Sequence, residues 1–437
     1  MKNKGNLSRG CSSISTILAS FLVMLTLAQP VMAASVALSI EDSVALALKS
    51  NADIKIAEDS REKARWALNQ AKSNKGFAVK LTHTDTHYSS PIVINEQSSN
   101  NSYNNQLSLS IPVYSGGKLE SQVEQAQLAL TVAEHELNAA KQLLRQNVIT
   151  YYYNVQEYRN DVKVNQETVD NYAAHLDLVQ AQYRAGSVAK AEVLSSQVQL
   201  ANAQDSLSQS QNNYELAVAK LNNAIGLPLD SQLDLKQQLT YEKNPSSLEE
   251  CLQYALTNRP ELAKYQAKLG SAEADVKIAK SGYLPTVDFS LAQSWSDKKF
   301  PGADNGSWQA SLTASMNLFD SGLNKSKIKQ SEYSLDTAKE QARQQRDTIM
   351  LEVREAYLSM REAEKRIDTK KVAIEQAEES LMIAETRYRL GVGTNLAVFD
   401  AVVALNTAKL NSNKALYDYN TSKAQLEKAM GIAVAAK

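Results

Sequence analysis

The sequence predicts a mainly α-helical protein that also carries four amphipathic β-strands and is built from two copies of one unit. Three observations predict this fold class: the chain repeats itself, heptad patterns run over very long stretches, and short alternating segments interrupt them. Aromatic residues make up only 6% of the chain, and it holds 15 Gly and 8 Pro in 437 residues. Such a composition favours long helices with thin, Ala-rich seams over a thick globular core.

The repeat is visible at two offsets. Residues 39–43 match residues 247–251 at an offset of 208, and residues 114–117 match residues 319–322 at an offset of 205. The second offset then holds as far as Gly226 and its counterpart Gly431. Internal repeats of this kind are the sequence signature of a duplicated structural unit. We therefore expect a first unit over residues 34–226, a linker over residues 227–246 and a second unit over residues 247–437.

Each unit is expected to form a helix, two strands, a very long helix, a glycine turn and a shorter return helix. In the first unit the predicted elements are helices at about 40–74, 117–185 and 190–225 and strands at about 77–88 and 103–113. In the second unit they are a helix at 247–281, strands at about 285–295 and 308–318, and the equivalents of the long and return helices.

The long helix of each unit carries a heptad seam. In the first unit one series of seven-residue steps consists of Val123, Leu130, Leu137, Leu144, Tyr151 and Tyr158. A sustained seven-residue repeat imposes coiled-coil packing, because 3.5 residues per turn keep the seam facing its partner. A helix of that size is about 100 Å long at 1.5 Å per residue. The other helices are about half as long, so we expect them to stack end to end beside the long ones.

The N-terminus is typical of a secretory signal. Basic residues within the first nine positions precede an apolar stretch from Ile14 to Leu27, and small residues follow it. We expect residues 1–33 to be removed as a signal peptide, leaving an exported protein without a helical membrane anchor. Cleavage would also remove Cys11, so Cys251 would be the single remaining cysteine and no disulfide could form within the chain.

The predicted strands alternate apolar and polar residues. On the strand at 285–295, for example, Val287, Phe289 and Leu291 share one face. Aromatic residues lie where interfacial belts would be: Phe77, Tyr114, Tyr283 and Phe319 at one end, and Trp295 and Trp308 at the other. This pattern is typical of outer-membrane barrels.

The alternative is a soluble antiparallel sheet with one solvated face. Four strands cannot close a barrel, so two, three or more chains would have to share one.

Three recurring signatures carry a resemblance to a known family. They are the strand end that runs into glycine (111–117 and 316–322), the strand start at 282–287, and the distal turn at 183–186 and 388–391. Over essentially the whole mature chain the sequence resembles the TolC-type outer-membrane efflux and secretion channels.

The resemblance implies a homotrimer whose 12-stranded barrel lies among outer-membrane lipid and continues as a helical tunnel into the periplasm. It also implies docking onto a periplasmic adaptor (membrane fusion) protein and an inner-membrane RND, ABC or MFS transporter. The chain would then be the passive exit duct of a tripartite efflux pump or a type I secretion system.

The resemblance also implies functional residues at the periplasmic tip. The family's constriction carboxylates lie six and nine residues after the turn glycine, where this chain has Glu192 in one unit and Asp400 in the other. Such a ring would favour cations. Tyr388, with its counterpart Tyr183, fits the family's gating tyrosine, but Gly393 stands where some relatives carry arginine. Adaptor contact is expected at the helix turns, at Gly186, Gly391, Gly393 and Thr394. The alternatives are solvated surface acids, packing tyrosines and turns without a partner.

Other function classes find little support. His83, Asp85 and His87 share one strand face and could ligate a metal, but a polar rim beside the apolar positions is the simpler interpretation. No nucleophile–base pair, phosphate loop or carboxylate dyad stands in a supporting context, so we expect no enzyme activity, cofactor or metal. The formal net charge of −1 does not indicate a nucleic-acid partner. Two rival interpretations stay open: a periplasmic coiled-coil adaptor, and a structural or adhesive coiled-coil protein.

Overall fold

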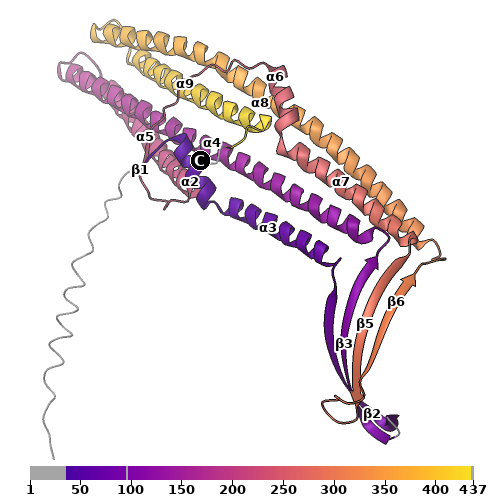
Figure 1. The fold of residues 1–437 in the computed structure, drawn as a ribbon. Coiled ribbons are helices and arrows are strands. Elements are labelled where there is room, and N and C mark those ends of the chain that lie inside the picture. The colour runs from indigo at the N-terminus through magenta and orange to yellow at the C-terminus, as the bar shows by residue number, and fades with distance from the viewer. Residues whose placement is uncertain (1–35, 95–96, 435–437) are drawn as a thin grey trace, which may run out of the picture.

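The computed structural model describes residues 36–94 and 97–434, so the predicted signal peptide and Cys11 lie outside the described residues. The molecule is elongated, with a bundle of long helices that ends in turns on one side and in a β-sheet on the other (Figure 1). The elements of the first unit are β1 (Val36–Leu38), α2 (Ile40–Ser50), α3 (Ala52–Ser73), β2 (Ala78–Ile94), β3 (Gln97–Tyr114), α4 (Lys118–Arg184) and α5 (Lys190–Ile225).

The second unit follows the same order. Its elements are β4 (Leu233–Leu235), α6 (Leu248–Asn258), α7 (Pro260–Lys280), a 3-10 turn (Ser281–Tyr283), β5 (Thr286–Asp297), β6 (Ser307–Ser315), α8 (Leu323–Arg389) and α9 (Asn395–Met430). Adding 205 to the bounds of α4 and α5 gives the bounds of α8 and α9, and adding 208 to those of α2 gives those of α6. The prediction of a mainly helical chain with antiparallel strands is confirmed.

The helices expected at 40–74 and 247–281 are each broken in two, which corrects the sequence interpretation. In the first unit the break is at Asn51, whose extended backbone ends α2 and whose side chain accepts a hydrogen bond from the Asp53 amide at the start of α3. In the second unit Pro260 begins α7 and holds Arg259 in an extended conformation. A residue before proline is disfavoured in the helical region, so the break is a local property of the sequence.

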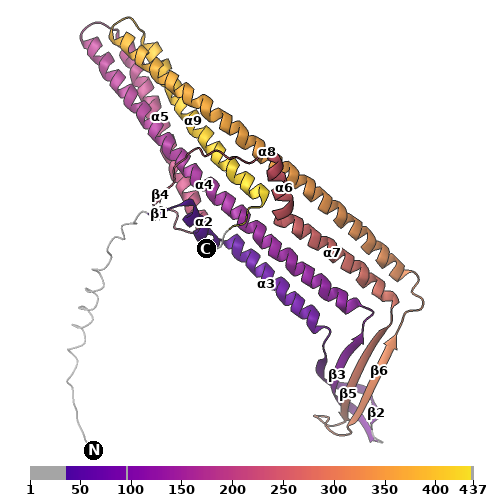
Figure 2. The same cartoon turned by 45° about the horizontal axis from the view of Figure 1, so that its top comes forward.

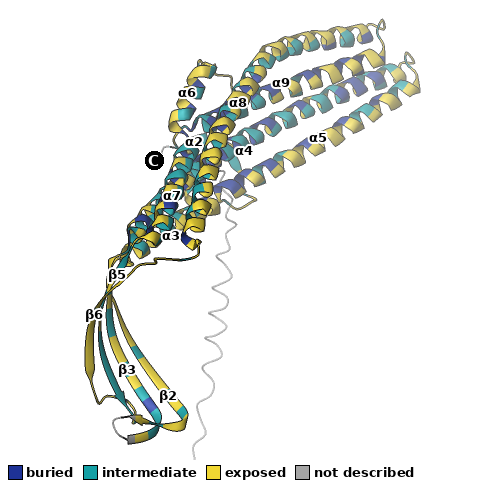
Figure 3. Ribbon diagram, turned by 90° about the vertical axis from the view of Figure 1, so that its right-hand side faces the viewer, coloured by how far each residue is buried: buried dark blue, intermediate teal, exposed yellow. Residues whose placement is uncertain are grey.

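The two long helices run the full length of the bundle. Both α4 and α8 hold 67 residues, which corresponds to about 100 Å. The shorter helices lie beside them, α3 and α7 toward the sheet and α5 and α9 toward the turns (Figure 2). The buried residues lie in thin stripes along these helices rather than in one central core (Figure 3). The fully buried ones include Tyr152, Val155, Leu221, Val353, Met360 and Tyr419.

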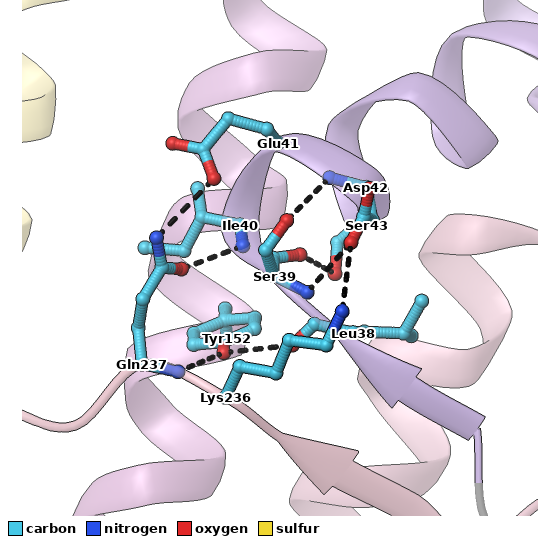
Figure 4. Close-up of polar contacts among 9 residues, drawn as sticks. All are labelled: Leu38, Ser39, Ile40, Glu41, Asp42, Ser43, Tyr152, Lys236 and Gln237. Carbon is cyan, nitrogen blue, oxygen red and sulfur yellow. Dashed lines mark hydrogen bonds and ion pairs between the residues drawn. The ribbon is translucent and has the colours of Figure 1, made fainter.

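A polar junction ties the start of the described chain and the inter-repeat segment to the middle of α4 (Figure 4). β1 and β4 form a two-stranded parallel sheet, and the buried Tyr152 hydroxyl lies beside it. That hydroxyl donates to the Leu38 carbonyl and accepts from the Gln237 amide, both at 3.0 Å. Further along the same segment, the Tyr419 hydroxyl donates to the Glu242 carbonyl at 2.5 Å. The segment between the units is thus anchored to one helix of each unit.

The second sheet has four antiparallel strands in the order β2-β3-β5-β6, so β2 and β6 are its edges. The register brings the apolar faces of all four strands to one side. One cross-strand row joins Val79, Leu109, Leu291 and Ala310, and the next joins Ile111, Phe289 and Leu312. On the opposite side, Ser290 and Ser311 share a hydrogen bond of 2.8 Å. Within the described residues no helix covers the apolar face, and Leu81 and Leu312 are exposed.

The strand bounds differ from those expected. β2 and β3 extend as a two-stranded ribbon through a Ser- and Asn-rich stretch, whose low strand propensity hid it in the sequence. β6 ends at Ser315 instead of 318, because Thr286, the first residue of β5, pairs with Ser315 and leaves the next residues without a partner strand in this chain. Among the described helices, none combines the length and apolarity that a membrane span requires.

Candidate functional site at the helical tip

The two turns at the end of the bundle have the same backbone design. Gly186 between α4 and α5 and Gly391 between α8 and α9 have φ of 80° and 77°, which favours glycine at both positions. Open space surrounds both glycines, so the conformation and not crowding requires them. Gly393 differs, because a Cβ there would lie 2.8 Å from the Tyr388 amide nitrogen. Thr394 then caps α9 through its Oγ1, which accepts from the Ala397 amide at 3.2 Å.

The two gate tyrosines predicted from the sequence lie in different environments. Tyr388 on α8 is only 4% exposed, and its hydroxyl donates to Oε2 of Glu192 on α5 at 2.8 Å. This bond joins the second unit to the first. Tyr183 on α4, the equivalent position, is 44% exposed. Packing was the alternative role considered for both tyrosines, and within the chain only Tyr388 is packed.

A buried hydrogen-bond cluster supports Tyr388. The His175 ring on α4 lies 4.9 Å from the Tyr388 ring, and its Nε2 is 2.5 Å from Oδ1 of Asn395 on α9. The Asn395 amide nitrogen donates to the Glu192 carbonyl and to Ser196 Oγ, both at 3.3 Å. With the amide nitrogen committed to these acceptors, Oδ1 faces the histidine, so His175 Nε2 is the donor. Four helices therefore meet in one polar cluster.

Sequence reasoning missed His175 and Asn395. A signal was present in the spacing, because Asp161, Thr168 and His175 lie seven residues apart on α4. All three bond to asparagines on α9: Asp161 to Asn413, Thr168 to Asn406 and His175 to Asn395. Polar residues at heptad positions fix the register between helices at some cost in stability.

The two predicted constriction carboxylates are not equivalent in the structure. Glu192 is half-buried and accepts the Tyr388 hydrogen bond, whereas Asp400 on α9 is exposed. Burial, reinforced by the hydrogen bond and charge of Glu192, raises the pKa of Tyr388, so this phenol stays a donor. Burial also raises the pKa of Tyr172, with a smaller contribution from the Asp400 charge. Of the two acids, Asp400 is the more exposed to solvent.

The aromatic residues predicted for the membrane interfaces flank the sheet. Phe77, Tyr114, Tyr283 and Phe319 lie at the junctions between strands and helices and are all exposed. At the other end, Trp308 is 73% exposed and Trp295 is half-buried, and both lie on the apolar face. From Val113 to Asn105, which pairs with Trp295, the strand rises about 27 Å. That height is close to the apolar band of outer-membrane barrels.

The three residues considered as metal ligands form a polar row at the outer end of that face. His83 Nε2 lies 2.8 Å from Asp85 Oδ1, and its Nδ1 bonds to Asn105 at 2.7 Å. His87 Nδ1 bonds instead to Asn101 at 2.7 Å. Among the described residues, no group of three or more His, Cys, Asp or Glu side chains is arranged to hold a metal ion.

Comparison with known proteins identifies the family. The family model described as outer membrane efflux protein matches residues 44–227 and 251–432, one range in each unit. TolC of Escherichia coli K12 is 24% identical over 306 residues, which cover 67% of this chain and 62% of that protein. The chain thus matches less than two thirds of that relative's length.

Solved structures show the same fold. The Campylobacter jejuni outer membrane channel CmeC superposes with a TM-score of 0.80 at 17% identity, covering 90% of this chain and 85% of that one. The Vibrio cholerae outer membrane protein VceC gives 0.79 at 17% identity, covering 90% and 96%. These findings confirm the resemblance seen in the sequence. The chain belongs to the outer membrane efflux protein family, a family of channels rather than enzymes, and it is an outer-membrane protein.

Proposed function

We propose that three copies of this chain form the exit duct of a tripartite efflux pump or type I secretion system. The observation that carries the proposal is the four-stranded sheet, which has one continuous apolar face and two unpaired edges, β2 and β6. An open sheet edge is not tolerated in lipid, so the edges must pair with other copies. Three copies supply 12 strands, an even number within the range of outer-membrane barrels.

The helices would continue the barrel as a tunnel. Each copy contributes two helices of 67 residues, and the sheet lies at one end of both. With the sheet in the outer membrane, the turns at Gly186 and Gly391 would lie about 100 Å away in the periplasm. Small molecules or proteins would pass through this tunnel passively. The energy would come from an inner-membrane transporter of the RND, ABC or MFS class.

The tip is the proposed contact with a periplasmic adaptor. Gly186, Gly391, Gly393 and Thr394 shape the two turns, and apolar side chains beside the second turn face solvent: Leu390 is 72% exposed and Val392 is 66% exposed. Exposed apolar side chains that cluster at one end of a protein mark an interaction surface. The family resemblance supports a periplasmic adaptor as the partner at this surface.

The tip is also the proposed gate. The bond from Tyr388 to Glu192 joins the two helical hairpins of one copy, so it would have to break when the hairpins move apart. Asp400 from three copies would form a ring that favours cations, with Glu192, whose carboxylate accepts the Tyr388 hydrogen bond, as a second contributor. Tyr183 is proposed as the gate residue on the side that faces another copy.

Purified protein inserted into a planar lipid bilayer tests the duct. We expect discrete conductance steps and a native mass of three chains in detergent by light scattering. An adaptor or an adhesive coiled coil would give no conductance, and protein found wholly in the soluble periplasmic fraction would overturn the proposal. A point variant with a disrupted apolar face, Leu109→Asp, should abolish insertion, whereas Ser108→Asp on the opposite face should be tolerated.

A further inference from the structure

A buried acid lies on the seam between the two helical hairpins of the chain, where α4 of the first hairpin packs against α9 of the second. Glu157 on α4 is 6% exposed, and among the described residues it is the one Asp or Glu that is buried. Its Oε2 accepts from the Asn154 amide at 3.3 Å, and Lys414 Nζ on α9 lies 3.7 Å from its Oε1. Both contacts are long, so the carboxyl group gains little in return for its burial.

The lysine that faces Glu157 is bound more closely to another acid. Lys414 Nζ is 3.1 Å from Oδ1 of Asp418, one turn further along α9, and the lysine side chain is 52% exposed. The other oxygen of Asp418 accepts from Arg366 of α8 at 2.9 Å. The nearest cation is therefore shared and partly solvated, and it leaves Glu157 without a partner of its own.

The same positions of the second unit carry opposite charges. At the offset of 205, the counterparts of Glu157 and Asp161 are Glu362 and Arg366. The Glu362 side chain is 61% exposed and lies 2.7 Å from Arg366, which is an ordinary pair of opposite charges four residues apart. In the first unit an acid replaces the arginine, so two like charges stand four residues apart. The first unit thus places its less favourable pair on the seam.

The charges on the seam balance only when one carboxyl group holds a proton. Glu157, Asp161 and Asp418 supply three negative charges, whereas Lys414 and Arg366 supply two positive ones. An unpaired buried charge is costly, so the proton belongs on the most buried acid. Burial raises the pKa of Glu157 to about 7, and the charges of Asp161 and Asp418 act in the same direction against the opposing effect of Lys414.

Tyrosines also surround this cluster. Tyr158 follows Glu157 on α4 and, like Tyr214 of α5, packs against the main apolar cluster of the first unit. The Lys414 ammonium lies 4.4 Å from the centre of the Tyr417 ring on α9. Burial, followed by the charge of Glu157, raises the pKa of Tyr417, so this phenol stays uncharged. The group on this part of the seam that exchanges its proton near neutral pH is therefore Glu157.

We propose that Glu157 is the proton-binding group of a latch between α4 and α9, which holds the two hairpins together when it is protonated and lets them part when it ionises. This inference rests on the proposed gate and adds the condition that opens it. When the hairpins part, water reaches the carboxyl group and its proton leaves to solvent, so parting and proton loss are linked. The latch is separate from the tip, because His175 lies about 27 Å further along α4.

The direction of the effect follows from the burial of Glu157. Well below pH 4.5 the carboxyl group is protonated whether the hairpins are together or apart, so pH has no influence through it. Between that value and about 7, ionisation favours the parted hairpins, in which the group is hydrated. Above that range both arrangements are ionised and the effect levels off. Acid therefore holds the tip closed, and neutral or alkaline pH eases its opening.

Planar bilayers test the latch by its pH dependence. The open probability of the wild type should rise roughly tenfold from pH 5 to pH 8, whereas Glu157→Gln should stay low at both values. The acids of the tip are the same in both proteins, so the difference between them reports Glu157. Glu134→Gln, the same change at an exposed glutamate of α4, is the matched control and should behave like the wild type. A rise in Glu157→Gln as steep as in the wild type would overturn the latch and leave the duct standing.

A second measurement follows the hairpins without any need for conductance. In a Cys251→Ala background, Ser187→Cys and Leu390→Cys place spin labels at exposed positions of the two turns. Dipolar electron spin resonance in detergent should give a longer mean distance at pH 8 than at pH 5, and adding Glu157→Gln should abolish the difference. Equal distances at the two pH values would overturn the latch. A pH-dependent distance in a protein that does not conduct would overturn the duct and leave the latch standing.

Discussion

Tyr388 and Tyr183 occupy the same position of the repeat and end in opposite environments. Tyr388 is buried because α4, α5 and α9 of the same chain surround it, through His175, Glu192 and Asn395. Tyr183 has no such surroundings in its own chain and stays exposed. A duplicated residue therefore acquires its environment from the helices that its own copy packs against, and the buried tyrosine is the one that bonds to the other unit of the chain.

The Tyr388 hydroxyl can be removed without removing the ring. Tyr388→Phe keeps the packing against His175 and loses the bond to Glu192, at a cost of about 1 kcal/mol in the free energy of the closed tip. We expect a several-fold rise in open-channel probability in planar bilayers. Tyr333→Phe, a substitution at an exposed tyrosine of the same helix, should leave gating unchanged and is the control. Identical gating in the two variants would contradict the assignment.

The unequal environments of the two acids predict unequal effects on ion selectivity. Asp400→Asn should lower the preference for cations markedly, since Asp400 is exposed; Glu192→Gln should lower it less, because Tyr388 already donates to that carboxylate. Reversal potentials in a salt gradient measure both. The double variant Asp400→Ala with Glu192→Ala should lose most of the preference, and unchanged selectivity there would rule out the ring.

Glu157 on α4 predicts a dependence of stability on pH. It is 6% exposed, and burial raises its pKa from 4.5 to about 7, although Lys414 lies 3.7 Å away. The folded protein therefore holds this proton more tightly than the unfolded chain. The resulting stabilisation is complete below pH 4.5 and is lost as the pH rises through about 7, by no more than about 3 kcal/mol.

Thermal midpoints in detergent at pH 5 and pH 8 measure this dependence. The wild-type protein should lose more stability between these values than Glu157→Gln, which cannot ionise. Glu134→Gln, an exposed substitution on the same helix, should behave like the wild type. A wild-type midpoint that rises from pH 5 to pH 8 relative to Glu157→Gln would contradict the sign.

At the scale of elements, the same break between two helices is formed by different residues in the two units. Asn51 ends one helix and caps the next with its own side chain. Arg259, its counterpart, lies before a proline, and its buried guanidinium binds Glu261, Glu352 and the Ala429 carbonyl. The first break is local, whereas the second also ties α7 to α8 and α9.

This difference predicts unequal costs of substitution. Arg259→Met leaves Glu261 and Glu352 without their partner and should destabilise the protein by about 3 kcal/mol, near the lower end of the range for a broken buried pair because Glu352 is partly exposed. Asn51→Ala removes one cap and should cost about 1 kcal/mol. Denaturant midpoints compare the two, and equal losses would show that Arg259 acts only as the residue before proline.

At the scale of the whole molecule, the repeating apolar patterns of the sequence predicted the long helices and the apolar side of the sheet. The heptads gave the long helices to within a residue of Lys118–Arg184, and the alternation at Val287, Phe289 and Leu291 gave the apolar side of the sheet. The break at Asn51 was missed, because one capping residue leaves the apolar pattern intact. His175 was missed because its partner on α9 is 220 residues away in the chain. Such contacts depend on how the helices pack, and the spacing of residues along the chain indicates them only weakly.

Assembly should also govern the stability of the whole molecule. Because β2 and β6 are unpaired in one chain, most of the sheet's stability would come from neighbouring copies. We expect the thermal midpoint of the detergent-solubilised protein to rise with protein concentration, measured over a hundredfold range. A midpoint independent of concentration in a sample that light scattering shows to dissociate would contradict this expectation.

The ribbon formed by β2 and β3 would extend the barrel beyond the outer surface of the membrane. β5 pairs with β3 only from Tyr103 onward, so the outermost part of the first hairpin stands beyond the four-stranded sheet, whereas residues 298–306 fold back, held by Asn105. In an assembled barrel, these Ser- and Asn-rich ribbons would be the part of the protein that lies farthest from the helical turns. The three extra residues of the first hairpin would then alter what the cell displays on its surface and leave the width of the pore unchanged.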